Sequence, residues 1–189
     1  AAFEENLRLR RELVAADPRD LDRLLRLIEA LNRIGEAARA RGNRGAALDA
    51  CRERRDLAAA LYAARPENRR WQALLRTAHE DFAELKTEQG DVAAAKRSLK
   101  SALDVSRRLV SAVPNHVAWR RRHAAILRKL GNLEEDAGEP NAALTHYRES
   151  RAVRIRLFEE NPGDPVLKLS VALIELDVGD VHLTRDDAA

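Results

Sequence analysis

The chain has 189 residues, of which 45% are hydrophobic and 34% charged, and its 34 basic and 31 acidic side chains leave a formal net charge of +3. The charged share exceeds the ~25% usual for soluble domains and suits long helices with one solvated face. Because the two signs are interspersed and the net charge is small, binding of nucleic acid or of a membrane surface is not expected.

Cysteine usage and apolar runs narrow the class further. The single Cys51 excludes an intramolecular disulfide and a cysteine zinc site, and it favours a reducing cytoplasm as the compartment. No apolar run reaches the ~18 residues of a membrane span. Because the chain contains no methionine, we expect a mature chain or an excised domain whose true N-terminus lies elsewhere.

A period of 48 residues runs through the chain. It is kept by the prolines Pro18, Pro66, Pro114 and Pro162, by the glycines Gly42, Gly90 and Gly138, and by Trp71 and Trp119. A fixed period of this size indicates an array of stacked supersecondary units. We therefore predict one continuous domain over 1–189, with a half repeat at 3–16, full repeats at 18–65, 66–113 and 114–161, and a half repeat at 162–185.

The first segment, 3–16, has the pattern of the second helix of a repeat, since Leu13 occupies the position of Leu61, Leu109 and Leu157. No helix of its own hairpin precedes it. We therefore expect part of its apolar set to be exposed. This set is Phe3, Leu7, Leu9, Leu13 and Val14.

Each full repeat predicts two antiparallel helices of about 20 residues, since the apolar positions of 119–137 keep a 3.6-residue period. The first helix is expected to start after Asp20, Asn68, His116 or Asp164, of which three are good N-caps. It is expected to end at Gly42, Gly90 or Gly138, because glycine readily adopts the left-handed conformation after a helix. The second helix follows at once, and no strand pattern occurs, so the predicted class is all-α.

Small residues recur in the middle of the first helix, at Gly35, Ala83, Gly131 and Gly179. A glycine inside a helix costs ~1 kcal/mol relative to alanine. We therefore predict that a neighbouring helix passes close to the backbone at this position.

The series Gly131, Gly138, Ala143, Tyr147, Ser150 and Pro162 resembles a tetratricopeptide repeat (TPR). Each helix is about two turns longer than in the usual unit, as in long repeats of bacterial multidomain signalling proteins. The resemblance implies a right-handed α-solenoid of stacked antiparallel helical hairpins, about eight helices in all. It also implies a non-enzymatic scaffold for a protein or peptide partner. The first repeat departs most, because Arg23 replaces the tryptophan and Arg54 stands where Ala102 and Ser150 stand.

In this family the first helices line a concave surface, so the resemblance identifies groove candidates. They are Asn32, Arg33 and Glu36, then Glu80, Asp81 and Glu84, then Arg128, Lys129 and Asn132. The acidic middle set would favour a basic peptide. The competing interpretation is a merely solvated charged face.

Other chemistries find little support. The five histidines show no metal-ligand spacing, no serine or cysteine has a nearby base in the pattern, and no glycine-rich phosphate loop occurs. We therefore predict no enzyme activity, no cofactor and no metal, and we interpret Trp71 and Trp119 as core anchors. A structural alternative to groove binding is a spacer or oligomerisation element whose copies stack end to end.

Overall fold

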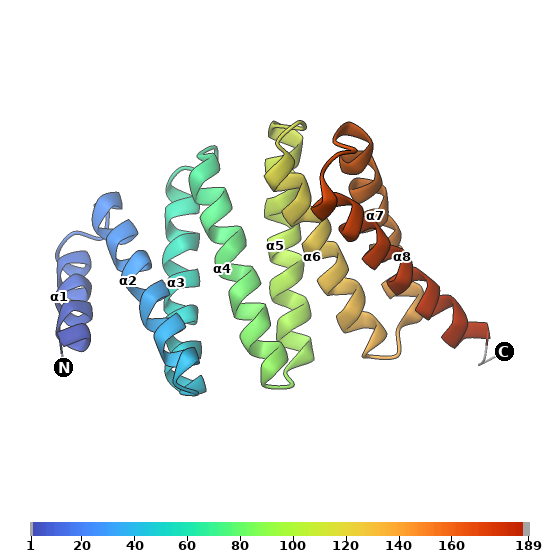
Figure 1. Ribbon diagram of the computed structural model, residues 1–189. Helices are drawn as coiled ribbons and strands as arrows, with labels where there is room; N and C mark the ends of the chain where they lie inside the picture. The colour runs from blue at the N-terminus through green and yellow to red at the C-terminus, as the bar shows by residue number, and fades with distance from the viewer. Residues whose placement is uncertain (1, 187–189) are drawn as a thin grey trace. The chain divides into compact units, whose positions relative to one another are not determined.

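The computed structural model describes the backbone of residues 2–186 and the side chains of residues 5–183. Within this part the chain forms eight α-helices and no strand (Figure 1), which confirms the predicted all-α class. The helices are α1 (Ala2–Ala16), α2 (Leu21–Ala40), α3 (Arg44–Ala64), α4 (Arg69–Glu88), α5 (Val92–Ala112), α6 (Val117–Glu135), α7 (Pro140–Glu160) and α8 (Pro165–Asp186). The chain divides into two compact units, Ala1–Ser98 and Leu99–Ala189, with the boundary inside α5.

The helices begin and end at or near the residues predicted from the sequence. Gly42, Gly90 and Gly138 have φ values of 73°, 76° and 73°, the left-handed conformation that a side chain disfavours. The Asp20 carboxylate accepts two amides of the first turn of α2 at 3.0 Å. His116, the weakest of the predicted caps, also caps its helix, since its Nδ1 accepts the Trp119 amide at 3.3 Å.

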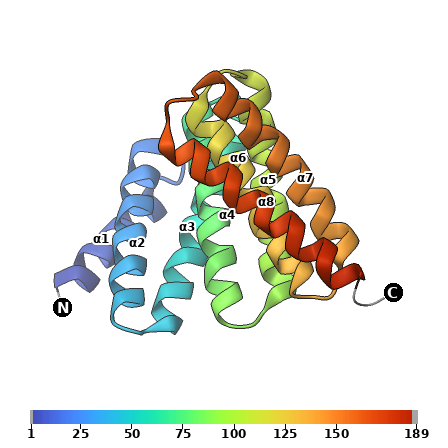
Figure 2. The ribbon, with the colours of Figure 1, turned by 45° about the vertical axis from the view of Figure 1, so that its right-hand side comes forward.

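In the first unit each helix packs on the next, α1 on α2, α2 on α3 and α3 on α4 (Figure 2). Leu27, Leu31 and Ala50 form one buried cluster between α2 and α3. A second cluster joins the ends of α2 and α3 to α4 through Ala38, Ala47, Cys51, Phe82 and Leu85. The α2–α3 hairpin and α4 thus form a continuous packed layer.

The prediction that part of the apolar set of the opening helix is exposed is confirmed. Leu9 and Leu13 of α1 are 46% and 51% exposed. Leu7 and Val14 are half-buried against the Leu27 cluster. Phe3 lies outside the described side chains.

In the second unit α7 packs against α6 on one side and α8 on the other. The buried core of α6 includes Ile126, Leu127 and Leu130, none of which is exposed. Between α7 and α8 the buried set is Ala143, Leu144, Tyr147, Ile174 and Val181.

A close helix contact was predicted at the mid-helix glycines. This prediction is confirmed at Gly131 and is wrong at Gly35 and Gly179. A Cβ on Gly131 would stand 2.3 Å from the Tyr147 ring. At Gly35 the nearest atoms would be 3.7 Å away, on Ala50, because small side chains of α3 face this glycine. At Gly179 no atom of another helix in the described residues lies within 4 Å of the Cβ position.

Candidate functional site

A groove runs between α2 and α4 in the first unit, and α3 forms its floor. Two hollows lie along it, with volumes of about 140 and 480 Å³. The smaller, here the Cys51 hollow, is lined by Leu31, Asn32, Gly35, Glu36, Arg39, Ala47, Cys51, Arg54, Asp81 and Leu85. The larger, here the Leu74 hollow, is lined by Leu25, Ile28, Glu29, Asn32, Arg33, Arg54, Arg70, Ala73, Leu74 and Thr77.

Arg54 and Asn32 line both hollows, so they stand at the boundary between them. Arg54 does not extend into solvent: the residue is 6% exposed. Its Nη1 donates to the Asn32 Oδ1 of α2, and its Nη2 donates to the Asp81 Oδ2 of α4. A buried charge is tolerated when it is paired and hydrogen-bonded, so this network holds both walls of the groove to the floor.

Polar contacts between side chains, here called polar rungs, connect successive first helices. The two residues that each rung joins are 49 residues apart, which is one repeat plus one residue. Asn32 and Asp81 are joined through Arg54, and Arg39 pairs directly with Glu88. In the second unit Arg128 pairs with Asp177, its Nη2 lying 2.8 Å from Oδ1. These pairs were not predicted, although opposite charges at this spacing on successive first helices were a signal for them.

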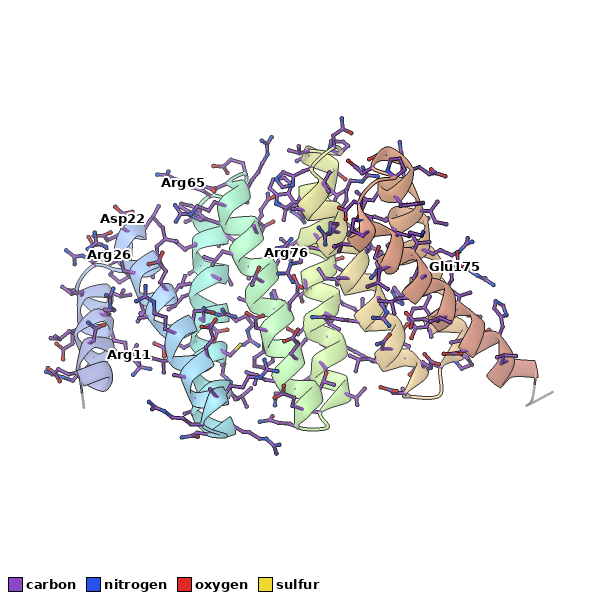
Figure 3. All side chains as sticks on the ribbon, in the orientation of Figure 1. Arg11, Asp22, Arg26, Arg65, Arg76 and Glu175 are labelled. Carbon is purple, nitrogen blue, oxygen red and sulfur yellow. The ribbon has the colours of Figure 1, made fainter. Side chains whose placement is uncertain are left out.

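Glu80 was predicted to face the groove, but it is buried. It is 3% exposed, and its carboxylate lies 3.1 Å from the Nε of Arg76, which is also buried. Arg76 is labelled on α4 in Figure 3. The register of α4 turns Glu80 away from the open groove and leaves Asp81 to line it.

Basic side chains neutralise the acidic residues in the middle of the groove. Asp81 faces the Arg54 guanidinium, and Glu84 lies 3.6 Å from Arg39. The carboxylates therefore do not form a purely acidic surface. Their charge alone gives no strong reason to expect a basic peptide.

The remaining candidates of the first unit lie on the groove walls. Glu36 is exposed, accepts a hydrogen bond from the Asn32 side chain at 2.8 Å and lines the Cys51 hollow. Arg33 is exposed and lines the Leu74 hollow. A binding role for either side chain stays a prediction.

In the second unit the corresponding surface lies between α6 and α8. Arg128 is held by Asp177, whose hydrogen bond raises the pKa of the guanidinium. Lys129 is half-buried, and Asn132 is exposed on the same helix. The Tyr147 hydroxyl lies 2.9 Å from the Asn132 Oδ1, so this predicted groove residue also contacts the core.

Two groups at equivalent positions of the repeat have raised pKa values. Burial raises the pKa of the Cys51 thiol, and the nearby Arg54 opposes this only in part. Burial, followed by the hydrogen bond to Glu135, raises the pKa of the Tyr147 phenol. Both groups are therefore neutral near pH 7, and neither has the ionised form of an activated nucleophile.

Trp71 and Trp119 were predicted to be core anchors. Trp71 is 5% exposed and meets that prediction. Trp119 is only half-buried and stacks on the His116 ring, with 4.0 Å between centroids.

Groups of side chains that could bind a metal ion are absent from the described residues. Among them, no three His, Cys, Asp or Glu side chains gather in a way that could hold a metal ion.

No helix in the described part of the chain is long and apolar enough to cross a membrane.

The fold is that of a helical-repeat protein built from stacked antiparallel hairpins. Residues 123–164 match the family model of the tetratricopeptide repeat, so this segment is a tetratricopeptide repeat, as the sequence indicates. No curated protein matches the sequence.

Solved structures share this architecture. BtubC (BKLC) from P. vanneervenii superposes with a TM-score of 0.64 at 19% identity over 98% of this chain. The chain spans 65% of the length of BtubC. MamA gives a TM-score of 0.46 at 14% identity, covering 98% of this chain and 91% of MamA. At these identities the likeness to BtubC shows the fold alone.

Proposed function

We propose that the groove between α2 and α4 binds an extended segment of a partner protein and that the chain acts as a non-enzymatic interaction scaffold. The observation that carries this proposal is the pair of hollows along one groove, divided by Arg54. Side chains of an extended peptide alternate in direction, so every second side chain points the same way. Two such side chains of one segment could enter the two hollows along the groove.

The groove is also held in place before any partner arrives. Arg54 ties Asn32 on one wall to Asp81 on the other, and Arg39 ties α2 to Glu88 of α4. A preformed surface loses little conformational freedom when a ligand binds, so more of the contact energy remains as affinity. The mixed charges at the rim favour a peptide that carries both signs over a uniformly basic one.

The test uses peptides selected from a random phage-displayed library on the whole chain and then titrated in solution. The double variant Glu36→Lys and Glu84→Lys should lower the affinity at least tenfold, because Glu36 lines the Cys51 hollow and Glu84 lies 3.6 Å from Arg39, which also lines it. The matched control, Asp49→Lys and Asp56→Lys, makes the same charge change at exposed positions of α3 that line neither hollow.

Thermal unfolding followed by circular dichroism checks that both variants are folded. Equal affinities for the groove variant, the control and the wild type would exclude the groove as the binding surface.

A second candidate function is end-to-end stacking of copies, and α8 provides the observation that favours it. Its exposed apolar side chains are Val166, Leu169, Leu173, Leu176 and Leu183, which are 38–66% exposed. Their spacing places them along one side of the helix. At the other end of the chain, Leu13 of α1 is 51% exposed, whereas Leu61, Leu109 and Leu157 at the same repeat position are buried.

We therefore propose that α1 of a second copy packs on the open face of α8. Sedimentation analysis should show association that grows with concentration and that Leu169→Glu with Leu176→Glu abolishes. A strictly monomeric wild-type chain at all concentrations would contradict stacking, and it would leave the groove proposal unaffected.

A further inference from the structure

We propose that the Cys51 hollow receives a tyrosine side chain of the bound segment. This inference rests on the proposed groove function and specifies one contact within it. It comes from comparing two repeats of the same chain at equivalent positions, two periods apart.

The third repeat provides the template, because a tyrosine of the chain itself occupies the corresponding place there. The Tyr147 ring lies against Gly131, whose Cβ would stand 2.3 Å from the ring. The hydroxyl of Tyr147 lies 2.9 Å from the Asn132 Oδ1 and 2.7 Å from the Glu135 Oε2. Glycine and two polar residues of one helix thus form a fitted site for a phenol ring.

In the first repeat the same site exists without its ring. The counterparts of Gly131, Asn132 and Glu135 are Gly35, Glu36 and Arg39, and all three line the Cys51 hollow. The counterpart of Tyr147 is Cys51 itself, which is far smaller. The hollow is thus the space that the missing ring leaves.

The volume fits an aromatic ring. The hollow measures about 140 Å³, close to the ~150 Å³ of an apolar cavity that holds benzene. Its inner wall carries the apolar side chains of Leu31, Ala47 and Leu85. A ring that enters from the groove would exchange water for these apolar contacts.

The polar rim selects tyrosine over phenylalanine. At the place where the third repeat holds the Tyr147 hydroxyl, the first repeat carries Glu36 and Arg39. A phenol hydroxyl can donate to the Glu36 carboxylate and accept from the Arg39 guanidinium. Arg39 is held at this rim by Glu88 across the groove.

The probe is p-cresol, the side-chain analogue of tyrosine, titrated into the whole ¹⁵N-labelled chain and followed by amide chemical shifts. We expect saturable shifts at Gly35, Glu36 and Cys51, and binding at least threefold tighter than for toluene. Cys51→Tyr should abolish the shifts, because it restores the ring of the third repeat. Cys51→Ala is the matched control and should keep them.

A second blocking variant, Gly35→Leu, fills the hollow from the opposite wall, where a Cβ would meet Ala50 and Ala47 only at ordinary van der Waals distances of 3.7 and 3.8 Å. It keeps the test decisive if Cys51→Tyr does not fold. The absence of saturable p-cresol shifts at the hollow in the wild type would overturn the proposal. Binding that persists in a folded blocking variant would do the same.

Selected peptides separate this inference from the groove function. If a peptide depends on Glu36 and Glu84 but keeps its affinity when its tyrosines are replaced by alanine, the tyrosine inference fails and the groove stands. If p-cresol binds the hollow but no peptide depends on the groove charges, the hollow stands and the proposed function fails.

Discussion

Gly35 and Gly131 occupy the same position of the repeat but have different surroundings. Gly131 faces the buried Tyr147 ring, whereas Gly35 faces the Cys51 hollow and the small side chains of α3. A glycine in the middle of any helix destabilises the folded chain, because glycine loses more backbone entropy on folding than other residues. Of these two positions, only Gly131 has a close contact that requires glycine.

Alanine substitutions at these two glycines should therefore have opposite effects. Gly35→Ala should raise the free energy of unfolding by up to ~1 kcal/mol, because alanine favours the helix and meets no atom closer than van der Waals contact. Gly131→Ala should lower it by about 1–3 kcal/mol, because the ring must move within a packed core. Urea unfolding of each variant measures both values, and changes of the same sign would contradict the model of this position.

The environment of His79 strongly favours its neutral imidazole. Burial, with a smaller effect of the nearby Arg55, lowers its pKa from 6.5 to about 4. Its Nδ1 lies 3.2 Å from the Ser98 Oγ, and this hydroxyl donates to the His79 carbonyl at 2.9 Å. The hydroxyl oxygen is thus free to accept the Nδ1–H of a neutral imidazole.

Stability should consequently fall in mild acid. The unfolded chain protonates this imidazole near pH 6.5 and the folded chain only near pH 4, so the stabilisation is present above pH 6.5 and is lost between these values. Allowing for partial exposure, we expect a loss of about 1–2 kcal/mol. Urea unfolding at pH 7 and pH 4.5 should show a smaller loss for His79→Gln, and equal losses in both proteins would refute the assignment.

At the scale of single elements, the sequence predicted what depends on local chemistry. Glycines at helix ends and side-chain caps act within one turn, so Gly42, Gly90 and Asp20 could be interpreted without a partner. The rungs across the groove depend instead on which side chains of two helices face each other. Only the packed helices show that Arg39 reaches Glu88 and that Glu80 turns inward to Arg76.

The hollow at Cys51 illustrates the same limit. The alignment of the repeats places Cys51 and Tyr147 at one position, but a small residue can be compensated by a neighbour. Arg54, three residues after Cys51 on α3, could have filled the space, and its packing could not be inferred from the sequence. The structure shows that Arg54 binds Asn32 and Asp81 and leaves the hollow open.

Helix α8 is apolar on more than one side. One side packs on α7 through Ile174 and Val181, while Leu169 and Leu176 are exposed on another. A helix of this kind is usually covered on both sides. This is the physical reason for the stacking candidate, whose test is independent of the groove.

At the scale of the whole molecule, the 48-residue period builds helical hairpins, and the side chains that vary between repeats give each unit its own surface. The first unit carries the two hollows, and the second fills the equivalent of one of them with Tyr147. Repetition therefore provides the scaffold. A difference between repeats provides the candidate site.

The most direct test of the groove is to map where a selected peptide binds, by the amide shifts of the whole ¹⁵N-labelled chain. We predict that the largest shifts lie on the facing sides of α2 and α4 and at Cys51 and Arg54 on the floor between them. Shifts confined to α8, or to the exposed side of α3 that carries Asp49 and Asp56, would contradict the account.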